Sequence, residues 1–177
     1  MVKDIVVLRY GHRIVRDYRV TTNVCLVARA FGASKIIIEG LYDKELEESI
    51  NKINKIWGGY FNIEFTENWR QKLKEHKTAG YCIIHLTMYG EKIVKVIKSI
   101  KKQKKIVIII GSQKVPKEIY DLSDYNISIG NQPHSEIAAL AILLNKLTGD
   151  KQMYSEFKNS KLKIIPQKSN KKVLVRK

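Results

Sequence analysis

Three short segments combine glycine with polar side chains, and each directly follows a run of aliphatic residues. They are residues 85–90, 111–115 and 129–136. Glycine lets a ligand approach the backbone closely, and loop amides with apolar flanks suit an adenine ring and a thioether chain. Any one loop is also explained as an ordinary turn. Together they predict a pocket formed by Leu86, Gly111, Ser112, Gln113, Lys114, Val115, Ile129, Gly130, Asn131, Gln132, Pro133, His134, Ser135 and Glu136.

The chemistry of these loops restricts the ligand. None of them matches the glycine-rich signatures that bind dinucleotides or nucleoside triphosphates, so a less anionic ligand is expected. Cys25 and Cys82 are isolated within apolar segments, which is typical of buried thiols rather than of a metal site or a disulfide framework. No metal is therefore expected.

A second concentration of polar residues lies near the N-terminus, between residues 9 and 19. Four arginines alternate there with Tyr10 and Tyr18: Arg9, Arg13, Arg16 and Arg19. Arginine binds phosphate through two parallel hydrogen bonds and aromatic rings stack on unpaired bases, so the segment favours RNA binding. A solvated loop is the alternative interpretation.

Asn23 and Arg29 lie six residues apart in the helical segment that follows. Most of the other side chains around Arg29 are small or apolar. An arginine in such a position requires a partner, which is either a structural acceptor or an oxygen that gains charge during a reaction. Composition alone leaves both interpretations open.

The elements that position these residues alternate between strand and helix patterns. Apolar runs at 5–9, 35–39, 61–65, 81–86, 106–110 and 125–129 predict six buried strands. Periodic segments at 22–31, 43–57, 68–76, 91–102 and 135–147 predict helices. This order predicts an α/β fold with a mainly parallel sheet and helices on both faces, with ligands bound at the carboxyl ends of the strands.

Charge and length indicate the partner and the domain organisation. The chain has 177 residues and a formal net charge of +16, which favours binding to nucleic acid. No apolar run is long enough to span a membrane and no signal peptide is recognisable, so we expect a cytoplasmic protein. Half of the excess charge lies after residue 150. We therefore expect one domain over residues 1–150 and a basic C-terminal appendage, residues 151–177, packed on it.

The motifs together resemble those of the SPOUT superfamily of RNA methyltransferases, most closely the archaeal family that methylates the ribose 2′-oxygen of a T-loop cytidine in tRNA. The resemblance extends from residue 8 to the third loop, and residues 130–136 are its most specific part. It implies S-adenosylmethionine as cofactor, tRNA as substrate, a homodimer and a C-terminal trefoil knot. Asn23 and Arg29 match the first superfamily motif, which implies that they are catalytic, with Arg29 serving the cofactor site of the partner subunit.

Two positions depart from the superfamily pattern. Gln113 replaces a common glutamate, and His134 lies where ribose-methylating relatives usually have asparagine. His134 is therefore expected to belong to the cofactor loop and not to be catalytic. Two other functions remain as alternatives: a non-enzymatic RNA-binding or ribosome-assembly factor of the same fold, and a methyltransferase that modifies an RNA base.

Overall fold

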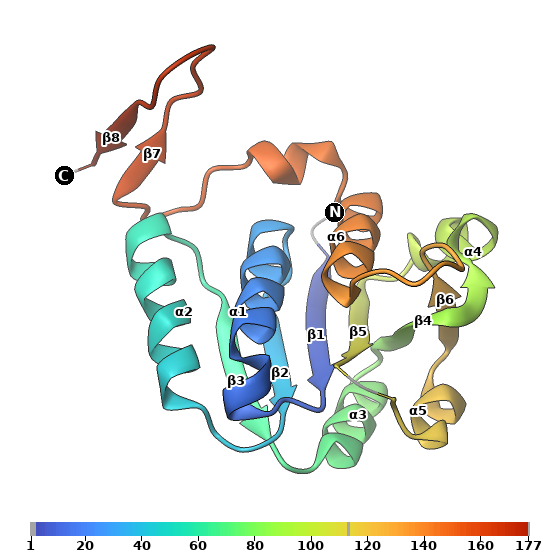
Figure 1. Cartoon of the computed structure of the whole chain (residues 1–177). Coiled ribbons are helices and arrows are strands. Elements are labelled where there is room, and N and C mark those ends of the chain that lie inside the picture. The colour runs from blue at the N-terminus through green and yellow to red at the C-terminus, as the bar shows by residue number, and fades with distance from the viewer. Residues whose placement is uncertain (1–2, 113, 177) are drawn as a thin grey trace.

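Six strands form one sheet in which every neighbouring pair is parallel (Figure 1). The computed structural model describes residues 3–112 and 114–176. The sheet order is β3-β2-β1-β5-β4-β6, which places β1 and β5 at its centre. The strands are β1 (Asp4–Tyr10), β2 (Lys35–Glu39), β3 (Asn62–Thr66), β4 (Cys82–Lys92), β5 (Lys105–Gly111) and β6 (Tyr125–Ser128).

Helices cover both faces of this sheet, as the sequence predicts. One hydrophobic core lies against α1 (Ile14–Ala30), α2 (Lys44–Trp57), α4 (Ile93–Ile100) and α6 (Glu136–Thr148). The second core lies against α3 (Trp69–Thr78) and α5 (Lys117–Leu122). Because side chains alternate along a strand, Ile5 and Val7 of β1 enter the first core and Val6 and Leu8 the second.

The first helix begins eight residues earlier than the predicted start at Thr22. Arg13 is its N-cap residue, and the Asp17 carboxylate accepts hydrogen bonds from the Arg13 backbone N–H and from Nε, at 3.0 and 2.7 Å. The charged first turn is thereby stabilised, although its composition resembles that of a loop. The arginine-rich segment is consequently a strand end, a short turn and the first turns of α1.

Two further differences concern the region between residues 86 and 122. Strand β4 continues to Lys92 instead of ending at Leu86, and residues 87–92 pass beside β6. Gly90 lies so close to the backbone of Asn126 and Ile127 that a side chain there would collide with both. The six-residue helix α5 was not predicted, because one and a half turns give too short a periodic pattern.

The C-terminal segment forms a 3-10 helix, Asp150–Tyr154, and an antiparallel hairpin of β7 (Leu162–Ile164) and β8 (Val173–Val175). It is seated on the end of α2, where the N–H of Gly59 donates to the carbonyl of Lys158 and the N–H of Lys161 donates to the carbonyl of Ile56. Gly59 has a φ of +79°, and a Cβ atom there would lie 2.6 Å from the Phe157 ring. Glycine therefore permits this close docking.

Candidate active site

A cavity of about 760 Å³ opens at the carboxyl ends of β4, β5 and β6. The segments after these three strands line it, which brings together the three glycine-containing loops. Its apolar lining includes Leu86, Val115, Ile127 and Ile129, and its polar lining includes Lys114. The size and the mixed lining are typical of a site for a nucleoside-sized ligand.

Most of the residues expected in the pocket do line it. These are Leu86, Gly111, Lys114, Val115, Ile129, Gly130, Gln132, Pro133, His134, Ser135 and Glu136. Ser112 and Asn131 do not, because the Ser112 hydroxyl donates to the carbonyl of Gly11 and the Asn131 amide donates to the carbonyl of Met88. Gln113 lies outside the described residues.

Eight further residues line the pocket beyond those expected to form it, and four of the eight belong to the predicted loop of residues 85–90. They are His85, Thr87, Met88, Tyr89, Lys117, Tyr120, Ile127 and Ala139. His85 is 2% exposed, and burial lowers the pKa of its imidazole, which a hydrogen bond with Asn126 partly offsets. The Tyr120 ring meets the His85 ring edge to face, and its hydroxyl lies 3.0 Å from Oγ1 of Thr87. Lys117 and Tyr120 belong to α5, so their place at the pocket depended on a helix that was not predicted.

Backbone geometry shapes the third loop. Gly130 has a φ of +101°, a conformation that other residues rarely adopt. The His134 ring spans the loop, with Nε2 3.0 Å from the carbonyl of Ile129 and Nδ1 3.1 Å from that of Ser135. The Ser135 hydroxyl accepts from the N–H of Ile137 and caps α6. The third loop therefore ends at the N-terminus of α6, with Ser135 as the N-cap residue.

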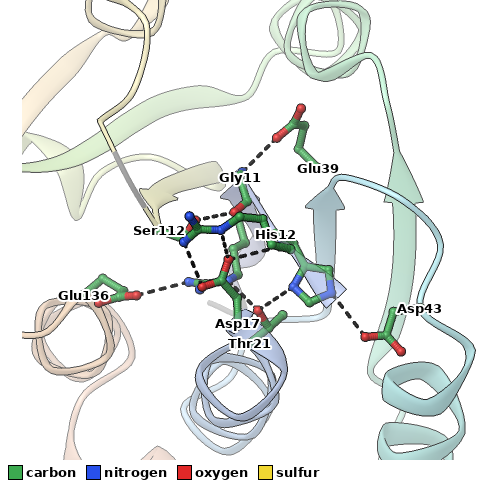
Figure 2. Close-up of polar contacts among 10 residues, drawn as sticks. Gly11, His12, Asp17, Thr21, Glu39, Asp43, Ser112 and Glu136 are labelled. Atoms are coloured by element: carbon green, nitrogen blue, oxygen red, sulfur yellow. Dashed lines mark hydrogen bonds and ion pairs between the residues drawn. The ribbon is translucent and has the colours of Figure 1, made fainter. Parts of the chain in front are cut away.

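A buried polar network joins this loop to the turn between β1 and α1 (Figure 2). Arg9 is fully buried, with Nη1 3.3 Å from a carboxylate oxygen of Glu136 and Nε donating to Oγ1 of Thr21 at 2.8 Å. Glu136 and Ser112 both extend toward this turn. Among the described residues, Nη2 of Arg9 has no hydrogen-bond partner. Two of the pocket loops are thus fixed to the start of α1.

The network continues from Thr21 to α2. His12 is buried, with Nδ1 2.9 Å from Oγ1 of Thr21 and Nε2 3.2 Å from a carboxylate oxygen of Asp43. Thr21 Oγ1 accepts from Nε of Arg9, and the Asp43 carboxylate accepts only, so each ring nitrogen of His12 faces a group that can form a hydrogen bond with it. Asp43 also caps α2 by accepting from the N–H of Leu46. This part of the site is a rigid support.

The arginines expected to contact RNA divide into two groups. Arg9 corrects the expectation, because a completely buried guanidinium held by Glu136 and Thr21 presents nothing to a phosphate. Arg13 forms a two-point ion pair with Asp17, and the hydrogen bond from its side chain is the main cause that lowers the pKa of that carboxyl. Arg16 and Arg19 are exposed on α1. These two remain the accessible cations of the segment.

Arg29 lies at the opposite end of α1 from the pocket. It is 7% exposed and donates to Oδ1 of Asn54 at 3.1 Å and to the carbonyl of Gly58 at 2.5 Å. Its guanidinium also stacks on the Phe157 ring, 4.4 Å from the centroid, and burial lowers its pKa. Within one copy of the chain Arg29 thus links α1, α2 and the C-terminal segment. Its expected role at the cofactor site of a partner subunit stays a prediction. Asn23 is exposed on α1 and does not line the pocket.

Two further observations concern other kinds of site. Within residues 3–112 and 114–176, no group of three or more histidine, cysteine or acidic side chains is arranged to bind a metal ion. Cys25 and Cys82 are both buried and unpaired in the first core. None of the helices in the described part of the chain is long and apolar enough to cross a membrane.

Sequence comparison relates the whole chain to one family. Residues 57–174 match the profile of the family described as "tRNA ribose 2′-O-methyltransferase, aTrm56". A tRNA (cytidine(56)-2′-O)-methyltransferase from Nitrosopumilus maritimus is 49% identical over 170 residues, which is 96% of each chain. The enzyme of the same name from Pyrococcus horikoshii is 52% identical over 174 residues, covering 96% of this chain and 84% of that protein.

Comparison with solved structures shows the same fold at low sequence identity. The A. aeolicus TrmH/SpoU tRNA modifying enzyme superposes with a TM-score of 0.63 at 20% identity, covering 88% of this chain and 81% of that one. The SpoU methyltransferase AviRb from Streptomyces viridochromogenes, solved with AdoMet, gives 0.58 at 15% identity and covers 88% of this chain and 59% of that one.

Proposed function

The chain belongs to the tRNA ribose 2′-O-methyltransferase family, and from this premise we propose that it transfers a methyl group from S-adenosylmethionine to the ribose 2′-oxygen of cytidine 56 in the T-loop of tRNA. The observation that carries the proposal is the pocket at the carboxyl ends of β4, β5 and β6, formed by the loops on which the resemblance rests. The chain is therefore an enzyme, and a purely RNA-binding role is set aside.

The pocket residues fit this cofactor. Leu86, Val115 and Ile129 provide apolar surface against which an adenine ring can pack. Gly130 has no side chain, so a ligand can approach the backbone of the third loop. Lys114 and Lys117 supply positive charge toward a carboxylate. When bound, the cofactor supplies a methyl group made electrophilic by a sulfonium sulfur.

The contribution of the protein to such a transfer is mainly positional. Displacement at a methyl group requires the oxygen, carbon and sulfur atoms in line, with reacting atoms about 3 to 3.5 Å apart. The buried network from Arg9 to Asp43 holds two of the pocket loops against α1, which keeps their geometry fixed. Lys114 and Lys117 are the cations that the described chain presents at its own pocket, and we assign them to the carboxylate end of the cofactor.

The RNA surface is proposed to include Arg16 and Arg19 on α1 and the basic appendage of residues 151–177. Both arginines are exposed, and most of the appendage is exposed as well. We retain the division into a methyltransferase domain, residues 1–150, and this appendage. Contacts of such cations with phosphates give an affinity that falls steeply with salt.

We also propose that two copies of the chain associate through α1 and α6, which lie side by side (Figure 1). Val15 is 97% exposed, and Ile14 and Ile142 are 40% and 43% exposed. These apolar side chains on adjacent helices would be covered by a second copy. Sedimentation of the protein and of a Val15→Lys variant tests this, because the substitution should shift the dimer toward monomer.

The trefoil knot implied by the resemblance and the cytoplasmic location belong to the same proposal. Knots are rare in proteins, so the proposal of a knot rests on membership of the family.

The experiment that tests the function compares two tRNA transcripts. One carries cytidine at position 56 and the other carries 2′-deoxycytidine there. Transfer of labelled methyl from S-adenosylmethionine should occur with the first and be lost with the second. Equal labelling of both would indicate a base-methylating enzyme, and no labelling of either would contradict the proposal.

A further inference from the structure

His85 occupies a distinctive place in the pocket. It projects from β4 toward α5 and lies opposite Asn126 in the register of β4 and β6. It is 2% exposed, yet it lines the cavity. Its Nδ1 atom lies 2.9 Å from Oδ1 of Asn126, and no hydrogen bond joins Nε2 to any residue in the described part of the chain.

The hydrogen bonds around His85 determine which ring nitrogen carries the proton. Nδ2 of Asn126 donates to the backbone carbonyl of Tyr120 at 3.0 Å, and a carbonyl oxygen only accepts. The amide orientation is therefore fixed, with Oδ1 of Asn126 directed to His85. An amide oxygen accepts as well, so Nδ1 of His85 must be the donor.

The second ring nitrogen is left as an acceptor. Burial lowers the pKa of His85 and keeps the imidazole neutral. A neutral imidazole protonated on Nδ1 has a lone pair on Nε2. Nε2 of His85 is thus a buried acceptor in the pocket, and an N–H group of the ligand can donate to it.

Building on the proposed function, we infer that His85 determines the cofactor's base: Nε2 accepts a hydrogen bond from the exocyclic amino group of adenine. The amino-acid end of the cofactor also carries an N–H donor. The placement of the lining favours adenine, because His85 lies deep beside Leu86 and Ile127, whereas Lys114 and Lys117 are exposed. The flat apolar base suits the deep end, and the charged end suits the lysines.

The test measures dissociation constants by calorimetry for S-adenosylhomocysteine and S-inosylhomocysteine. The inosyl compound has a carbonyl oxygen in place of the amino group, so two acceptors would face each other. The intact protein should bind the adenosyl compound about 10-fold or more tightly than the inosyl compound. His85→Phe, which keeps a ring but removes the acceptor, should reduce this ratio to about 3-fold or less.

Three controls complete the design. His76→Phe changes a histidine outside the pocket and should keep the full ratio. The side-chain amide of His85→Gln can present either an oxygen or an N–H to the ligand. This variant should lower the ratio while keeping affinity for the adenosyl compound, and it replaces His85→Phe in the test if that variant does not fold. A third ligand, S-adenosyl-4-thiobutyrate, lacks the α-amino group and keeps the length of the chain.

The outcomes separate this inference from the function on which it rests. An unchanged ratio in folded His85→Phe and His85→Gln, or no preference in the intact protein, would overturn the role of His85 while leaving cofactor binding in place. If the variants instead abolish the preference for S-adenosylhomocysteine over the thiobutyrate, the ammonium group is the donor and the adenine assignment is wrong. Failure of the intact protein to bind either nucleoside compound would contradict the proposed function itself.

Discussion

Replacing Arg29 with alanine should release the C-terminal segment from the domain. The substitution removes the hydrogen bonds to Asn54 and Gly58 and the stacking on Phe157. Hydrogen bonds from a charged donor contribute about 1.5–3 kcal/mol each and a cation–π contact about 0.5–2 kcal/mol. The stacking on Phe157 is the contact that reaches the C-terminal segment itself, whereas the two hydrogen bonds act through the end of α2 on which the segment is seated. We therefore expect a net loss of roughly 1–3 kcal/mol in docking free energy. Such a loss is large enough for the segment to open while the sheet stays folded.

Limited proteolysis measures this opening directly. Arg29→Ala should be cleaved near residues 150–160 at least 10-fold faster than the intact protein, with little change in far-ultraviolet circular dichroism. Phe157→Ala is the matched variant, because it removes the stacking partner and keeps the arginine; it should show the same change to a smaller degree. If Arg29→Ala abolishes methyl transfer to tRNA with unchanged cleavage, and Phe157→Ala leaves transfer intact, Arg29 is catalytic and the structural interpretation is refuted.

Other predictions concern the pocket, the RNA surface and pH. Gly111→Val should abolish S-adenosylmethionine binding in calorimetry without unfolding the protein, because Gly111 lines the pocket; unchanged binding would place the cofactor elsewhere. Arg16→Ala combined with Arg19→Ala should flatten the salt dependence of tRNA binding by about 0.7–0.9 per lost contact. Deleting residues 168–177 should also flatten it, and an equal slope would show that the tail does not contact RNA. Because burial lowers the pKa of His85 below its ordinary value of 6.5, the unfolded chain takes up a proton first as the pH falls. Denaturant midpoints should therefore decrease below about pH 6.5, and less so in His85→Phe.

The position of the pocket was predictable because it follows from strand direction alone. Once the apolar runs indicate a parallel sheet, their carboxyl ends meet at one edge, and the loops there must lie together. The contributions of Lys117 and Tyr120 were not predictable, since α5 has too few residues to show a period. His85 belongs to the strand itself, and only the partner across the sheet reveals its role.

The burial of Arg9 could have been predicted from the alternation of side chains along β1. The high arginine content of residues 9–19 favoured the interpretation as an exposed RNA-binding segment instead. Ile5 and Val7 enter the core beneath α1, and strand alternation places Arg9 on the same face. A strand covered on both faces buries the side chains of its middle residues, so Arg9, the arginine of β1, must find partners inside. Those partners, Thr21 and Glu136, are 12 and 127 residues away, and no local pattern identifies the second.

The position of Arg29 shows what motif spacing leaves open. The distance from Asn23 matches the superfamily motif, but a helix rises about 1.5 Å per residue. With α1 starting at Ile14, the fifteen residues to Arg29 carry it about 22 Å from the end of the helix that borders the pocket network. The expected start at Thr22 concealed this separation, because it placed Arg29 in the second turn of a short helix.

The central claim is that the chain methylates a ribose of tRNA. Its most direct test incubates unmodified tRNA with the purified protein and S-adenosylmethionine, digests the RNA and locates the new methyl group by mass spectrometry. We expect 2′-O-methylcytidine from position 56 and no other new methylated nucleoside. A methyl group on a base, or tRNA that binds the protein and gains no methyl group, would contradict the claim.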